Sequence, residues 1–176
     1  PGVCHHLGLP GDDEALAVDV DQAGNAYVTG YISLNSDSLP EMFIYKYVQI
    51  ARLDPMGTLN FWAWFGTVKS RGRAIAVDPA GLVYLGGEVA SSDFPTTTGA
   101  IQSEWLEAID GFVSVLDLDA GAVLYSTYLG GSGEWCSLCA SVVNGIAVDG
   151  AGMIYVTGQA AASFPTTANA YQRTFD

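Results

Sequence analysis

The sequence has 176 residues, of which 49% are hydrophobic and 14% charged, and its formal net charge is −13. This aromatic-rich composition excludes a disordered chain, which would be poor in aromatic residues and rich in charge. The acidic balance disfavours nucleic acid and anionic membrane surfaces as partners, and no apolar run is long enough to insert into a membrane. The 21 glycines are typical of an all-β protein with many tight turns.

The first element resembles the end of a strand that occurs later in the chain. Residues 7–12 (LGLPGD) align with residues 129–134 (LGGSGE). We therefore expect residues 3–7 to form the fourth strand of a blade whose first three strands are missing from this sequence. Because the chain starts at Pro1 without Met or a signal peptide, we expect a processed or partial chain.

A hairpin then occurs three times. Its residues are VDQAGNAYVTG at 20–30, VDPAGLVYLGG at 77–87 and VDGAGMIYVTG at 148–158. Each first strand ends at an Asp whose carboxylate can accept hydrogen bonds from turn amides, and the Gly three residues later can take a positive φ. A second strand follows. The turn glycines recur at spacings of 57 and 71 residues, which indicates a repeat architecture.

The segments between the hairpins repeat as well. A connection with the residues FPTT occurs at 94–97 and 164–167, and a third strand ends in Leu-Asp at 53–54 and 116–117. A fourth strand at 61–66 (FWAWFG) matches 125–130 (YSTYLG). The first of these is apolar on both faces, as a strand between packed sheets needs. Four antiparallel strands per repeat of roughly 40 to 70 residues predict β-propeller blades.

Three motifs resemble the bacterial seven-bladed β-propeller repeat, often abbreviated SBBP. They are AVDxxGxxYVTG at 147–158, DFPTT at 93–97 and VLYSTYLGG at 123–131. The resemblance covers nearly the whole chain and implies a module of large extracellular proteins, but it implies no particular activity. The first repeat departs from it by keeping only Leu39-Pro40 in its connection. The third repeat lacks the third and fourth strands.

The expected fold class is all-β, with four-stranded antiparallel sheets that form a partial propeller of about two and a half blades. Residues 1–11 are expected to be the last strand of an incomplete blade, 12–66 blade 1, 67–133 blade 2, and 134–176 the first half of blade 3, all in one propeller domain. Such a chain cannot close a ring of about four to eight blades, and its end blades would leave apolar faces and strand edges open. Either it belongs to a longer propeller, or copies complete one another's blades, or it forms a stand-alone open array.

Two acidic features are candidate calcium sites, because Ca²⁺ takes several converging oxygen ligands. Asp12, Asp13 and Glu14 form the densest acidic cluster, whose other interpretation is a solvated loop. The second feature is the Asp of each hairpin turn, at positions 21, 78 and 149. Its recurrence at one structural position favours turn capping over metal binding.

Three cysteines are present, an odd count for a secreted protein. Cys136 and Cys139 lie in an insertion, since residues 130 and 146 are 16 apart where the matching residues 66 and 75 are 9 apart. A local Cys136–Cys139 disulfide is the first hypothesis, and a bridge from Cys4 to one of them is the alternative.

Other candidate sites have weaker support. Cys4, His5 or His6 could join the loop cysteines in a metal site, although the two histidines point to opposite faces of a strand. Glu104 and Glu107 have the residue type for a sugar site, and an exposed face of a short helical turn is the alternative. No catalytic motif and no cofactor motif is found in the sequence.

We therefore expect a non-catalytic extracellular or cell-surface propeller module that serves adhesion, scaffolding, or surface or filament assembly by inter-chain blade completion. Its partners would be other copies of itself or the missing blades of a longer chain. The alternatives are a carbohydrate-binding propeller, with Tyr and Trp stacking on sugars, and a fragment of a polysaccharide-acting enzyme propeller. No cofactor is expected, with calcium as the alternative.

Overall fold

The computed structural model describes residues 13–34, 45–106, 109–131 and 140–173, and these form ten β-strands without a helix. Sheet A contains β1 (Glu14–Val20), β2 (Ala26–Leu34), β3 (Tyr45–Leu53) and β4 (Leu59–Phe65). Sheet B contains β5 (Ser70–Val77), β6 (Val83–Val89), β7 (Asp110–Asp117) and β8 (Ala122–Leu129). Sheet C contains β9 (Val142–Val148) and β10 (Ile154–Gln159).

Every strand pairs antiparallel with its sequence neighbour in the same sheet, so sheets A and B have the same strand order. The all-β fold class predicted from the sequence is confirmed. The fourth strand predicted at residues 3–7 lies outside the described residues. No helix capable of crossing a membrane occurs in the described part of the chain.

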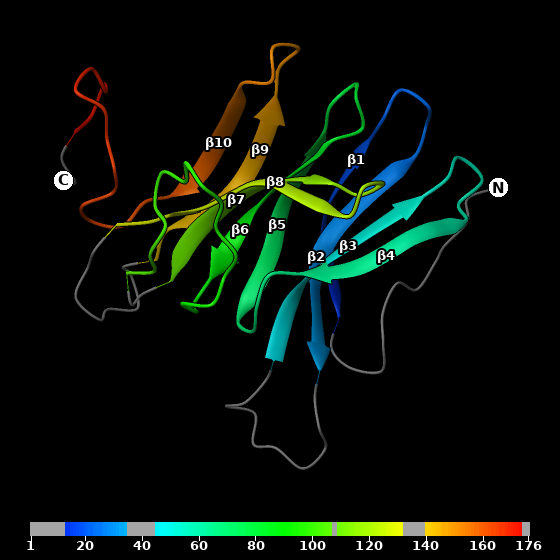
Figure 1. Ribbon diagram of the computed structural model, residues 1–176, viewed down its shortest axis with the longest axis horizontal. Helices are drawn as coiled ribbons and strands as arrows, with labels where there is room; N and C mark the ends of the chain where they lie inside the picture. Colours follow the sequence, from blue (N-terminus) through cyan, green and yellow to red (C-terminus); the bar gives the residue numbers. More distant parts are fainter. Residues whose placement is uncertain (1–12, 35–44, 107–108, 132–139, 174–176) are drawn as a thin grey trace.

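The three sheets follow one another side by side, from sheet A at the right of Figure 1 to sheet C at the left. Strand β5 lies against β1, β2 and β3, and strand β9 lies against β5, β6 and β7. The core therefore occupies two interfaces, one between each pair of neighbouring sheets. The larger core cluster includes Tyr27, Ile50, Leu85 and Phe112, and the smaller one is built on Tyr84.

Polar contacts also join sheets A and B. The Asp19 carboxylate of β1 accepts a hydrogen bond of 2.8 Å from the amide of Val77 in β5. Arg52 of β3 forms an ion pair of 2.9 Å with Asp119 in the β7–β8 turn. These contacts fix the rotation of one sheet against the next, because each needs a particular pair of residues to face across the interface.

The same irregularity occurs in the first hairpin of every sheet. A β-bulge lies between Ala15 and Ala17 in β1 and between Gly72 and Ala74 in β5, and the matching shift in sheet C lies between Thr157 and Gly158. The second strand carries a glycine opposite each bulge, at positions 30, 87 and 158. A Cβ at any of these glycines would collide with a backbone carbonyl of the first strand. The bulge therefore imposes the repeated glycine.

Candidate functional site

The described members of the predicted calcium cluster are not gathered into a metal site. Asp13 is half-buried, its Oδ1 accepts the amide of Ser33 at 3.0 Å, and its Oδ2 is buried without a hydrogen-bond partner among the described residues. Glu14 is exposed at the start of β1, and Asp12 lies outside the described residues. Within residues 13–34, 45–106, 109–131 and 140–173, no three His, Cys, Asp or Glu side chains form a group suited to a metal ion.

Several other predicted site residues fall outside the described part of the chain. They are Cys4, His5, His6, Glu107, Cys136 and Cys139. Glu104 is described and exposed and lies at a bend, and the turn expected between Glu104 and Glu107 extends beyond the described residues. The disulfide and metal hypotheses on the cysteines remain predictions.

The turn aspartates cap their turns as the sequence predicts. In each hairpin, Oδ1 accepts two backbone amides at 2.9–3.0 Å, and Oδ2 accepts the hydroxyl of a Tyr six residues later. The pKa of Asp21 is lowered, mainly by the side-chain hydrogen bond from Asn25. The pKa of Asp149 is lowered, mainly by the Met153 amide. All three aspartates therefore have the geometry of turn caps.

A buried carboxylate at the start of β7 was not found from the sequence. Asp110 is fully buried, and its Oδ2 accepts Gln102 Nε2 at 3.0 Å and the Leu106 amide at 3.1 Å. Gln102 Oε1 in turn accepts the Gly130 amide at 2.8 Å, which ties the long connection to the end of β8. Asp110 Oδ1 has no partner in the described residues and occupies the space where a Cβ of Gly130 would lie. Burial raises the pKa of Asp110, and the Leu106 and Gln102 hydrogen bonds oppose this rise.

Replacing Asp110 with Asn should change how stability depends on pH. A raised pKa means that the folded state binds more protons than the unfolded chain in the pH range between the ordinary value of 3.8 and the raised value. Wild-type stability should therefore fall as pH rises through this range, and this contribution should be missing from Asp110→Asn. Urea unfolding of both proteins at several pH values measures the difference, and parallel pH curves would contradict the prediction.

An aromatic cluster closes the interface between sheets A and B. Phe94, in the connection after β6, is 4% exposed. Its ring centroid lies 5.5 Å from Phe65 of β4, 4.7 Å from Phe112 of β7 and 5.7 Å from Tyr128 of β8. Sheet A thus supplies one ring, and the third and fourth strands of sheet B supply the other two.

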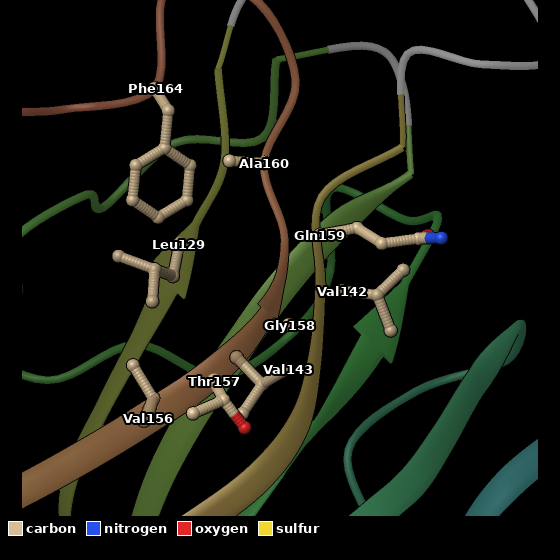
Figure 2. Close-up of a pocket in the computed structure, with 9 residues that line it drawn as sticks. All are labelled: Leu129, Val142, Val143, Val156, Thr157, Gly158, Gln159, Ala160 and Phe164. Carbon is tan, nitrogen blue, oxygen red and sulfur yellow. The ribbon is translucent and has the colours of Figure 1, made fainter. Parts of the chain in front are cut away.

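At the second copy of this motif, the cluster is open. Phe164 matches Phe94 in the sequence, and it lies beside Leu129 of sheet B, whose position matches that of Phe65. It is only half-buried, because the described part of sheet C contains no third or fourth strand. A pocket of ≈190 Å³ is left there (Figure 2), lined by Leu129, Val142, Val143, Val156, Thr157, Gly158, Gln159, Ala160 and Phe164. Phe164 also lines a second pocket of ≈300 Å³ with Gln172 and Arg173.

The ≈190 Å³ pocket beside Leu129 is a candidate binding site. Its lining is predominantly apolar and has no ionisable side chain, so it suits an apolar group and not acid–base chemistry. The repeated FPTT motif indicated that Phe94 and Phe164 are equivalent, but only the structure shows that one is covered and the other open. No protein-family model matches the chain, and no match is found among curated proteins.

Proposed function

We propose that the three sheets are blades of a β-propeller and that the chain is a non-catalytic extracellular module, which assembles with other chains by completing blades between them. The common strand order, the shared bulge and the adjacent first strands support the propeller interpretation. The low charged fraction and the acidic net charge of −13 support an extracellular structural role.

The observation that carries assembly is the open edge of sheet C. Among the described residues, β10 pairs only with β9, whereas β6 in the matching position pairs on both sides. An open strand edge readily pairs with another chain. The outer face of sheet A is apolar as well, with Val18 63% and Val20 56% exposed on β1. A chain with an open edge at one end and an apolar face at the other suits head-to-tail association.

Analytical ultracentrifugation of the full chain over a wide concentration range tests the proposal. We expect a mass that increases with concentration, and we expect Val18→Lys to weaken association by about tenfold because it places a charge on the apolar face. Met56→Lys is the matched control, since Met56 is 80% exposed in the β3–β4 turn, away from both proposed surfaces. A chain that stays monomeric at every concentration would exclude self-assembly.

A second candidate function is carbohydrate binding through aromatic side chains on sheet A. Trp64 of β4 is 53% exposed, and its ring lies 5.8 Å from Trp62 and 6.3 Å from Tyr47. Exposed aromatic rings can stack on sugars. Calorimetric titration with soluble oligosaccharides would support this function only if Trp64→Ala abolishes binding. The rings of the Phe94 cluster, in contrast, lie between sheets and are not available to a ligand.

A further inference from the structure

The internal repeat shows what fills the position that is open in sheet C. Gly87 of β6 and Gly158 of β10 occupy the same place in the hairpin, each opposite a bulge. In sheet B, Phe112 of β7 pairs with Gly87, and its ring uses the space left by the missing side chain. A Cβ at Gly87 would lie 2.7 Å from Phe112 Cε1. Because Gly87 has no side chain, it leaves space that an aromatic ring of the third strand occupies.

Gly158 has equivalent neighbours, with Leu129 at the position of Phe65 and Val156 at the position of Leu85, but no aromatic ring lies over it within the described residues. Gly158 lines the ≈190 Å³ pocket together with Leu129, Val156 and Phe164. Figure 2 shows the Phe164 ring and Leu129 at one end of this pocket and Val156 at the other. In sheet B the Phe112 ring contacts Phe94, so a ring at Gly158 would contact Phe164. Such a ring would bury apolar surface on several sides.

The register of β7 on β6 defines the rest of the missing strand. The pairs run from Val83 with Leu116 to Val89 with Asp110, in antiparallel order. Ser114 pairs with Leu85, the residue that matches Val156. A strand on β10 in this register would place a small residue opposite Val156 and an aliphatic residue opposite Ile154.

We propose that the edge of β10 binds an antiparallel strand of a partner chain that carries an aromatic residue opposite Gly158, a small residue two positions later and an aliphatic residue two positions after that. This inference rests on the proposed blade completion and names its partner. Backbone pairing with β10 supplies affinity, and the pocket selects the aromatic side chain. The strand β3 of the same chain fails this requirement, because Gln49 occupies the position of Phe112.

A labelled peptide with the sequence of residues 109–118 provides the direct test, by fluorescence anisotropy against the full chain. We expect it to bind about tenfold more tightly than the same peptide with Phe112→Ala, because the ring enters the pocket. A peptide of residues 45–53, with Gln at the aromatic position, should bind as weakly as the Ala peptide. Equal binding of all three peptides would overturn the proposal.

Two variants of the full chain locate the binding surface. Val156→Lys places a charge in the pocket and should weaken binding of the 109–118 peptide by about tenfold. Tyr155→Lys is the matched control, because Tyr155 is the neighbouring exposed residue of β10 and does not line the pocket. Its binding should stay within about twofold of wild type. The opposite ranking of the two variants would place the peptide on the other face and overturn the proposal.

A free peptide can bind too weakly to detect, because ordering an isolated peptide costs entropy. In that case the same strand is tested after covalent linkage to the full chain. A copy of residues 109–131 is joined to the C-terminus through a flexible Gly/Ser linker, which gives a high effective concentration. We expect hydrogen exchange of the β10 amides to slow by about tenfold or more, and the slowing to be largely lost with Phe112→Ala in the added copy. Unchanged exchange in β10 with the Phe copy would overturn the inference.

The outcomes separate this inference from the proposed function. A chain that is monomeric at all concentrations but binds the peptide with the expected ring dependence retains the strand site and loses self-assembly. A chain that self-associates, while its β10 amides exchange freely and the peptide does not bind, retains assembly and loses the strand site.

Discussion

Replacing Phe94 with Ala should lower the free energy of unfolding by about 3–5 kcal/mol, the range for a buried Phe in a packed core. Phe94 is almost fully buried and contacts three other rings from both sheets that it joins. Its loss would leave a cavity that the rigid strands on either side cannot fill. Urea denaturation monitored by circular dichroism measures the change.

The internal repeat supplies the control for this prediction. Phe164→Ala removes the same side chain from the same motif, but Phe164 is half-buried beside an open pocket. Its replacement should lower stability by only about 1 kcal/mol. If Phe94→Ala does not fold, Phe94→Leu should still fold with a smaller loss. Equal losses at positions 94 and 164 would show that the pocket at Phe164 is filled in solution.

Replacing Gly87 with Ala should destabilise the protein by about 3 kcal/mol or more, because the added methyl group has no space. It would collide with the Arg71 carbonyl oxygen across the bulge and press on the Phe112 ring. Both neighbours are held by sheet B, so relief requires moving a strand. Thermal and urea unfolding measure the effect.

Gly150→Ala is the matched control. A Cβ at Gly150 meets no atom within 4 Å, and its φ lies outside the left-handed region. We expect a change within about 0.5 kcal/mol. A similar loss at both glycines would mean that backbone flexibility, and not the collision at the bulge, explains the requirement for Gly87.

The local structure could be predicted from the sequence because short-range chemistry controls it. The Asp and Gly of each hairpin turn lie three residues apart, and one carboxylate satisfies two nearby amides. The sequence places the ends of these two third strands at Leu53-Asp54 and Leu116-Asp117, and the observed ends at Leu53 and Asp117 agree with the repeat. The Asp110 network could not be predicted, because Gln102 joins the carboxylate to Gly130, 28 residues further along the chain.

The residue pattern by itself determined that this protein is all-β, where its hairpins turn and which segments are equivalent, since turn chemistry and strand alternation act over a few residues. Only the tertiary structure decided that Phe94 is enclosed while Phe164 faces an open pocket. The two residues have the same local sequence, and among the described residues they differ in whether a third and a fourth strand pack beside them. Burial is a property of distant neighbours, so two identical motifs can differ in what they bind.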